Sequence, residues 1–420
     1  MSEEQKLFGM KPEGARWLFV LVGFIMNLCL GSVYAYSIFK PAVEKTFGVS
    51  SFMGNLPFMT FLAFFSILMF FGGQLMGKLG PRNLSLLGGV IVGVGWMLSS
   101  FATDIWTMTL TYGVIAGSGV GLAYGCPVQM GGKWFPDRTG LAVGLQLAGF
   151  GGSAFFTGKI ASGMLGDVKT LEAAQVGANL SHTCLMFGIA FTIILVLLAL
   201  PFHFPAAGWK PEGWTPKAGA AAAVDYTTGE MVKTPTFWGL FLCYTFGCLA
   251  GLMAIGISKP VGSDIIKIAG ATATTLVGVF AIFNAVGRPL FGWLTDRITP
   301  RWAALVNLSL MLVVSLAMLV AKEGSTVLYV AAFIGFWLSL GGWLAIAPTA
   351  TKAYFGAKNY ARNYGTVFFA YGLGAILGGI ISGKAKDVFG TYTYAFYPTA
   401  ALALIGIVLT LLLIKPPKKA

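Results

Sequence analysis

Apolar runs of about 20 residues, separated by short polar segments, follow one another along the whole 420-residue chain. An α-helix needs a run of that length to cross the hydrocarbon core of a bilayer, which is about 30 Å thick. Inside hydrocarbon every backbone N–H and C=O group needs a protein partner, and a helix supplies these partners within one segment. With 56% hydrophobic and 10% charged residues, the chain lies far from the balance of a soluble domain. The sequence therefore predicts an all-α integral membrane protein.

Twelve such runs can be placed, and each is a predicted transmembrane helix. They cover residues 17–39, 54–76, 84–102, 106–130, 139–163, 181–204, 236–258, 271–294, 302–321, 326–350, 363–383 and 391–414. The boundary at Asp104 is the least sharply marked. The first run is longer than the apolar region of a signal peptide, and no small-residue cleavage site follows it, so we expect a retained helix.

The distribution of Lys and Arg over the connecting segments predicts the orientation in the membrane. A cytoplasmic N-terminus places 18 of the 28 basic residues inside and 9 outside, with Arg288 in neither set. The inside set includes Lys6, Lys217, Lys418 and Lys419. Both termini are therefore predicted to be cytoplasmic. The net charge of +13 follows from this topology and does not indicate nucleic-acid binding.

The residues that usually carry catalysis or hold metals are sparse in the predicted helices. All five cysteines fall in apolar runs, without a CxxC pair and without a nearby cluster of His or carboxylate residues. They are Cys29, Cys126, Cys184, Cys243 and Cys248. No run holds a nucleophile, a base and an orienting acid together. We expect no metal, no cofactor and no enzymatic activity.

The chain repeats itself on either side of its one long polar connection. GQLMGKLGPR at residues 73–82 matches GWLTDRITPR at residues 292–301 with an offset of 219, and Lys40-Pro41 matches Lys259-Pro260 at the same offset. The connection at 205–235 is rich in Pro, Gly and Ala and is predicted to be a cytoplasmic linker. The repeat predicts two six-helix halves, 1–204 and 236–420, with the substrate bound between them.

Arg288 is the only charged residue between positions 269 and 295. A guanidinium stays protonated, and placing it at the middle of a membrane helix costs about 2.5–3.5 kcal/mol. One interpretation is that its long side chain reaches the headgroups, because about six residues, or roughly 9 Å, separate it from Leu294. The other is that it faces a cavity.

Two patterns favour the cavity. Small and polar residues recur on the helical face of Arg288 at steps of three and four, namely Thr274, Gly278, Ala281, Asn284, Gly292 and Thr295. The repeat places Met69 opposite Arg288 and Phe65 opposite Asn284, so the charge is present in one half only. A residue that merely marked the membrane boundary would have less reason to be asymmetric.

Two motifs resemble the loop signature of the major facilitator superfamily, and this resemblance covers the whole chain. They are GGQLMGKLGPR after the second run and GRPLFGWLTDRITPR after the eighth. In that family the loop charges form a cytoplasmic network that holds the outward-open state. The matching gating residues here are Lys78, Arg82, Asp296, Arg297 and Arg301. Gly77 stands where the first-half aspartate would be.

More specific resemblances indicate a family within that group. KWFPDRTGLAVGLQLAG at 133–149 resembles the helix-five signature of the monocarboxylate transporters, and YFGAKNYARNYG at 354–365 is similar to the oxalate/formate antiporters. The resemblance implies that Arg288 is the substrate-binding cation. The chain departs from the animal family at Asn284, where an acid is usual, and from the oxalate carriers at Tyr371, where a second cation is usual.

One cation in the cavity suits one carboxylate, because a buried dianion would need two compensating charges. We therefore expect a monocarboxylate such as lactate or pyruvate, held by Arg288 through a bidentate contact. The further candidate binding residues are Asn284, Tyr34, Tyr36, Tyr124, Gln146, Trp343, Phe368 and Tyr371. For each tyrosine, packing in the core or a place in an interfacial aromatic belt is at least as good an explanation.

The sequence constrains the coupling mechanism only weakly. No Asp, Glu or His lies deep in a predicted helix, so a symported proton would travel with the substrate carboxyl, with water or with a peripheral group. We expect a monomeric proton symporter with alternating access, in a bacterial cytoplasmic (inner) membrane. The alternative is an anion exchanger of the oxalate/formate type, and a sensor without transport is a third, more remote class.

Overall fold

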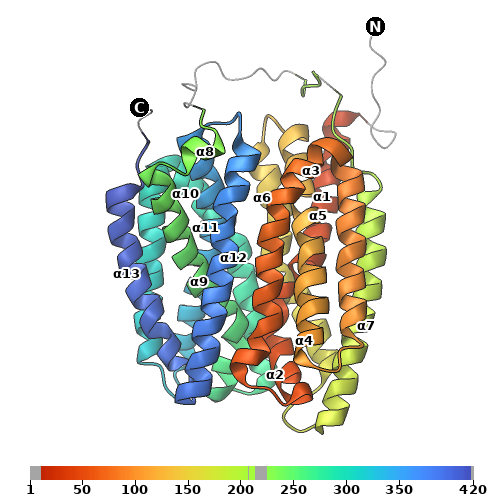
Figure 1. Cartoon of the computed structure of the whole chain (residues 1–420), viewed down its shortest axis with the longest axis vertical. Coiled ribbons are helices and arrows are strands. Elements are labelled where there is room, and N and C mark those ends of the chain that lie inside the picture. The colour runs from red at the N-terminus through yellow and green to blue at the C-terminus, as the bar shows by residue number, and fades with distance from the viewer. Residues whose placement is uncertain (1–10, 207, 213–224, 418–420) are drawn as a thin grey trace.

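The structure is a computed structural model, and it describes residues 11–206, 208–212 and 225–417. Lys6, Lys217, Lys418 and Lys419, and the middle of the predicted linker, lie outside these residues. Within the described part the regular structure is entirely helical (Figure 1). Ten of its helical stretches are long and apolar enough to cross a membrane. The prediction of an all-α multi-pass membrane protein is confirmed.

The elements run in one continuous series. They are α1 Pro12–Leu30, η1 Gly31–Ala35, α2 Tyr36–Phe47, α3 Ser51–Ser99, α4 Ile105–Met108, η2 Thr109–Ala116, α5 Gly117–Trp134, α6 Thr139–Leu165, α7 Ala173–Ala199, α8 Thr228–Met231, α9 Pro235–Asp264, α10 Gly270–Leu319, α11 Thr326–Phe355, α12 Tyr360–Phe389, η3 Tyr392–Ala395 and α13 Phe396–Leu413. The first candidate span combines α1, η1 and α2, and the third combines α4, η2 and α5.

The two longest helices are interrupted at equivalent places of the sequence repeat. α3 has 49 residues and α10 has 50, which as straight rods would be about 75 Å long, more than twice the hydrocarbon thickness. Gly80 (φ 73°, ψ 171°) breaks the helical conformation in α3, and Thr299 (φ 75°, ψ 155°) breaks it in α10. A proline follows each break, where its fixed φ suits the first turn of a new helical segment.

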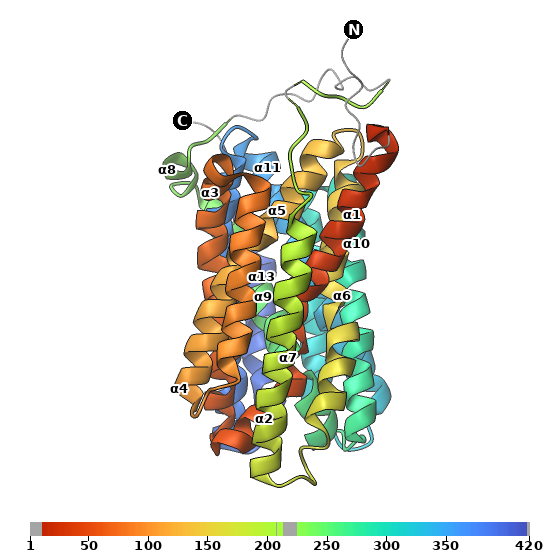
Figure 2. The same ribbon diagram turned by 90° about the vertical axis from the view of Figure 1, so that its right-hand side faces the viewer.

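α1 to α7 and α9 to α13 form two groups of helices, which we name the N-terminal and C-terminal halves. They meet mainly where α3 packs on α12 and α6 packs on α10. Glycine allows the close approach of helices within a half: a Cβ on Gly117 would lie 2.5 Å from the Phe61 carbonyl oxygen. Figures 1 and 2 show the start of α1 and the end of α13 at the same end of the bundle, with α2 at the opposite end.

Arg16 joins the start of α1 to the segment between α5 and α6. Its guanidinium donates to both carboxylate oxygens of Asp137, at 2.6 and 2.8 Å, and to the Trp134 carbonyl at 3.0 Å. The two side chains are only 8% and 17% exposed. Asp137 lies outside the membrane helices, and its hydrogen bonds from Arg16 hold the pKa of its carboxyl below the ordinary 3.8. The pair therefore stabilises the folded protein while Asp137 is ionised.

We expect Arg16→Gln to lower the free energy of unfolding by about 1–3 kcal/mol, because a half-buried carboxylate loses its charged donor. Arg138→Gln is the matched control: Arg138 lies 3.9 Å from the same carboxylate but is 63% exposed, so its loss should cost under about 1 kcal/mol. Thermal unfolding in detergent measures both changes.

The loss of unfolding free energy caused by Arg16→Gln should depend on pH in a defined way. A depressed pKa gives stability that is complete above the unfolded-state pKa and is lost as pH falls through the folded-state value. The difference from wild type should therefore be constant between about pH 5 and 8 and should shrink below about pH 4. Equal deficits for Arg16→Gln and Arg138→Gln would contradict this account of the ion pair.

Candidate functional site

Arg288 lies inside the protein, without a counter-charge from the residues that the structure describes. Its side chain is 4% exposed, and its Cζ atom lies 5.6 Å from the centre of the Phe150 ring, which belongs to the opposite half. Among the described residues it forms no ion pair, and its Nε and Nη1 groups have no hydrogen-bond partner. Its position in the interior does not match an arginine that extends along lipid to the headgroups.

Asn284 orients the guanidinium. Its Nδ2 donates to the Trp337 carbonyl on α11 at 2.9 Å, which fixes the amide plane. Its Oδ1 then accepts from Arg288 Nη2 one helical turn away, at 3.5 Å. Both side chains are buried. The arginine therefore has a neutral partner on the interior face of α10, which adds no counter-charge.

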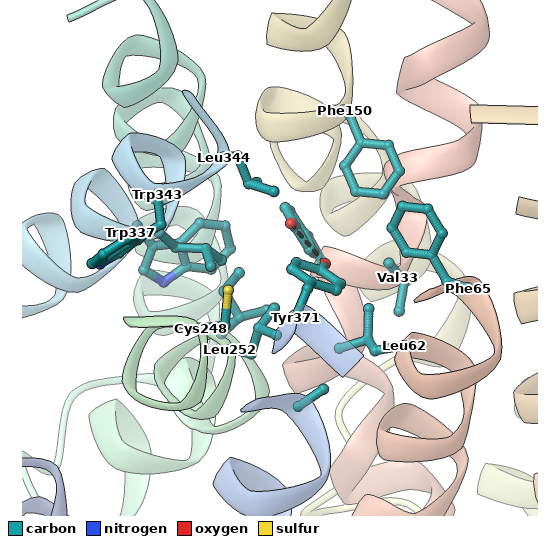
Figure 3. Close-up of a cluster of buried hydrophobic side chains, with 14 of the residues drawn as sticks. Val33, Leu62, Phe65, Phe150, Cys248, Leu252, Trp337, Trp343, Leu344 and Tyr371 are labelled. Carbon is teal, nitrogen blue, oxygen red and sulfur yellow. Dashed lines mark hydrogen bonds between the residues drawn. The ribbon is translucent and has the colours of Figure 1, made fainter. Parts of the chain in front are cut away.

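A hydrogen bond between two tyrosines joins the halves beside this arginine. The Tyr34 hydroxyl from η1 lies 3.0 Å from the Tyr371 hydroxyl of α12, and both side chains are fully buried. Figure 3 shows this bond as a dashed line, between Phe150 and Phe65 on one side and Trp337 and Trp343 on the other. Tyr34 is within electrostatic reach of Arg288.

Tyr124 and Phe368 complete an aromatic wall between the halves. The Tyr124 ring lies 5.2 Å from Phe150 and 5.1 Å from Phe65, and Phe368 lies 5.4 Å from Phe65. Tyr124 also approaches the Arg288 guanidinium closely enough to interact electrostatically with it. The structure thus brings six predicted site residues into one group, which we name the Arg288 group: Arg288, Asn284, Tyr34, Tyr124, Phe368 and Tyr371.

The remaining candidates lie elsewhere or at the border of this group. The Tyr36 hydroxyl donates to the Gly54 carbonyl at 2.6 Å, and Gln146 Nε2 donates to the Phe19 carbonyl at 3.0 Å. Both bonds lie within the N-terminal half, where the two side chains pack between its helices. Trp343 borders the Arg288 group from α11, with its ring stacked on Tyr244.

Sequence reasoning missed four residues of this region: Phe65, Phe150, Trp337 and Tyr244. The repeat indicates Phe65 only as the apolar equivalent of Asn284. Phe150 and Trp337 lie within long apolar runs. In such a run, the neighbouring sequence does not distinguish a residue that lines the site from one that packs in the core. Tyr244 carried a weak signal, since it is a polar aromatic residue inside an apolar run.

The end of the bundle opposite the termini is closed by contacts between the halves. The Asp387 carboxylate of α12 accepts from the backbone N–H groups of Ser51 and Phe52, at 2.8 and 3.0 Å, and so caps the start of α3 from the other half. Fully buried Lys40 donates to the Ser51 and Tyr392 hydroxyls at 2.7 and 3.1 Å.

A cavity of about 460 Å³ also lies at this end, lined by residues that include Glu44, Lys45, Asp264 and Lys386. With Lys169, the lining has three lysines and two acids, and Lys386 is already paired with Asp264 at 3.3 Å. It is separate from the Arg288 group, with which it shares no residue. Buried Arg288 is the stronger indicator of an anion site, because two of its donor groups have no partner among the described residues.

The predicted gating residues do not pair with one another in the described structure. Lys78, Arg82, Asp296 and Arg297 are exposed, and among the described residues Asp296 makes no ion pair. Arg301 instead donates to the Leu411 carbonyl. In the described structure these charges therefore do not link the halves at the end of the termini, whereas Asp387 and Lys40 link them at the opposite end.

The superfamily model for the Major Facilitator Superfamily matches residues 20–264 and 240–420. The chain belongs to this superfamily. The oxalate:formate antiporter of Oxalobacter formigenes is 29% identical over 97% of the chain and 94% of its own length. Monocarboxylate transporter 13 of Rattus norvegicus is 28% identical over 80% of the chain and 74% of its own length. These relatives are transporters and not enzymes.

Solved structures show the same fold at low sequence identity. A bacterial homologue of the human lysosomal transporter Spinster superposes with a TM-score of 0.70 at 15% identity, covering 96% of this chain and 98% of its own. The Escherichia coli fucose:proton symporter FucP, solved as a variant with a single substitution, superposes with a TM-score of 0.64 at 15% identity, covering 94% and 98% of the two chains. The major facilitator fold is therefore established for this protein.

Removing the Asp387 cap should favour opening at the end opposite the termini. The measurement uses Val33→Cys in a background without native cysteines, and a membrane-impermeant alkylating reagent added at the end of the bundle opposite the termini. We expect Asp387→Ala to accelerate alkylation of this cysteine. Val33 is fully buried in the centre of the bundle. A cap contributes about 0.5–2 kcal/mol, which corresponds to a rate increase of about 2- to 30-fold.

Asp104→Ala is the matched control, because the Asp104 carboxylate also caps a helix start, accepting from Trp106 N–H at 2.8 Å, but within one half. The control should leave the Val33→Cys alkylation rate at the parental value. Equal rates in Asp387→Ala and its parent would show that the cap does not hold the two halves together.

Proposed function

We propose that this protein is a secondary active transporter of small monocarboxylates of the lactate and pyruvate type. One observation carries the proposal: Arg288 is buried between the halves, and among the described residues two of its donor groups have no acceptor and no acid pairs with it. A permanent cation in low dielectric needs an anion, and a substrate carboxylate can accept two parallel N–H bonds from it. Relatives named as monocarboxylate transporters and as an oxalate:formate antiporter support an anionic substrate.

The charge count supports a monoanion. Within the Arg288 group the remaining polar atoms belong to Asn284 and to tyrosines, which are neutral donors or acceptors. Tyr34 and Tyr371 offer hydroxyls from the two halves, and Phe368 offers an apolar wall. A dianion would bring a second charge without a second cation from this group to compensate it.

The proposed topology has twelve membrane helices, with α3 and α10 each divided at the break near Gly80 and Thr299. Each division adds one membrane helix to the 10 candidate spans, which gives twelve. We further propose six-helix halves at 1–204 and 236–420, a cytoplasmic linker at 205–235, cytoplasmic termini, a monomer, and a bacterial inner membrane. Lys78, Arg82, Asp296, Arg297 and Arg301 would pair when the cytoplasmic end closes.

Arg288→Lys should lose most transport, because an ammonium group cannot make the planar two-bond contact with a carboxylate. We expect uptake of lactate or pyruvate in proteoliposomes to fall by about 10- to 100-fold, which corresponds to about 1.4–2.8 kcal/mol of lost binding. Arg138→Lys, a change in an exposed arginine, should retain wild-type uptake. Full uptake by Arg288→Lys would exclude the proposed site.

Proton symport predicts that an imposed inward proton gradient accelerates uptake. Binding of one carboxylate neutralises Arg288, and a proton that accompanies the substrate makes the cycle electroneutral. The exchanger alternative is favoured by the relative named as an oxalate:formate antiporter, and it predicts that internal formate or oxalate accelerates uptake instead. Uptake that ignores the pH gradient but requires an internal anion would replace symport with exchange.

A further inference from the structure

The cavity at the end opposite the termini lies between the two halves, and both of its walls present lysines. The N-terminal half contributes Lys45 of α2 and Lys169 of the connection between α6 and α7, and the C-terminal half contributes Lys386 of α12. Lys259 of α9 also lies within electrostatic reach of Lys169. Like charges therefore face each other across the interface at this end, and their repulsion disfavours its closure.

The two acids of the lining already have lysine partners. The Glu44 carboxylate lies 3.5 Å from the Lys40 ammonium, within the N-terminal half, and the Asp264 carboxylate lies 3.3 Å from the Lys386 ammonium, within the C-terminal half. Neither ion pair crosses from one half to the other. The two pairs neutralise charge on each wall separately and do not hold the walls together.

Lys45 and Lys169 form no ion pair with any of the described residues. The half-buried Lys45 ammonium donates to the Val168 and Leu171 carbonyls, at 2.8 and 2.6 Å, which leaves one of its three N–H groups. These carbonyls flank Lys169 in the sequence, so both lysines belong to the same part of the wall. Exposed Asp167 in this connection accepts from the Lys169 backbone N–H at 3.1 Å.

We propose that this cavity binds a small divalent oxyanion, such as sulfate or hydrogen phosphate, and that the bound anion stabilises the closed state at this end. Outside the two ion pairs, three lysines (Lys45, Lys169 and Lys259) stand against one acid, Asp167, so two net positive charges remain to be compensated. Ammonium donors on several sides suit an anion with several acceptor oxygens.

The position of the cavity gives the anion its effect on the two halves. An anion in the cavity is attracted by lysines of both walls, so it replaces repulsion between the halves with attraction. The volume of about 460 Å³ admits such an anion together with part of its hydration water. The site shares no residue with the Arg288 group, and its occupation does not depend on the proposed substrate.

The test measures opening at this end with the Val33→Cys protein in a background without native cysteines, in the absence of carboxylates. Alkylation by the membrane-impermeant reagent is compared in potassium sulfate and in potassium chloride of equal ionic strength, so that general screening is the same. Thermal-shift titration with sulfate supplies the Kd. An anion that binds only the closed state lowers the opening equilibrium by 1 + [L]/Kd, so sulfate at about ten times its Kd should slow alkylation about 10-fold.

Substitutions of the lysines locate the effect. The double variant Lys45→Gln/Lys169→Gln should bring the ratio of the alkylation rates in the two salts to about 1, whereas Lys169→Arg keeps the charge and should retain the slowing. Lys322→Gln is the matched control, because Lys322 is an exposed lysine outside the cavity lining. It lies at the same end, where the neighbouring Gly324 N–H donates to the Ile266 carbonyl at 3.1 Å. The control should keep the parental ratio.

Equal alkylation rates in sulfate and chloride for the Val33→Cys parent would overturn the site. A sulfate effect that survives in the double variant would also overturn it, because general exclusion of sulfate from the protein surface would then explain the slowing. If the double variant does not fold, Lys169→Gln alone should raise the Kd for sulfate about 2- to 5-fold, and an unchanged Kd would overturn the site. None of these outcomes requires monocarboxylate transport, so the proposed function stands or fails separately.

Discussion

The permanent positive charge of Arg288 in the interior of the bundle sets the requirements that the surrounding structure meets. A guanidinium cannot become neutral, so its burial is tolerable only where dipoles and an anion can compensate it. The protein supplies one amide oxygen from Asn284 and the face of the Phe150 ring. This partial compensation leaves Nε and Nη1 without an acceptor among the described residues.

The same residues connect ligand binding to the contact between the halves. Arg288 and Asn284 belong to α10, while Phe150 belongs to α6, and these two helices are one of the main contacts between the halves. The Tyr34–Tyr371 hydrogen bond crosses the same interface. A carboxylate bound at Arg288 would therefore change the electrostatics of the interface between the halves. At the far end, Asp387 accepts from backbone N–H groups across that interface, and Lys40 donates to hydroxyls of both halves and lies 3.5 Å from the Glu44 carboxylate.

Several features were predictable because they depend on local chemistry. A run of about 20 apolar residues predicts a membrane-spanning helix at any position in the chain. The offset of 219 between repeat motifs anticipated equivalent breaks, and Gly80 and Thr299 have the same extended, positive-φ conformation. Arg288 and Asn284 are spaced four residues apart, so their contact follows from helical geometry alone.

Other features required the packed structure. Tyr34, Tyr36 and Tyr371 are all buried tyrosines, yet Tyr36 bonds to the Gly54 carbonyl while Tyr34 meets Tyr371 across 337 positions of sequence. Gln146 has the polarity of a site residue but bonds to the Phe19 carbonyl. The sequence by itself determined the membrane helices, the repeat and the position of Arg288 within a predicted helix, because hydrophobic length, spacing and charge can be read from the sequence alone. Which aromatic and polar side chains surround that cation was decided only by the tertiary structure, because a helix rotation or a neighbour from the other half turns a side chain towards the interface or away from it.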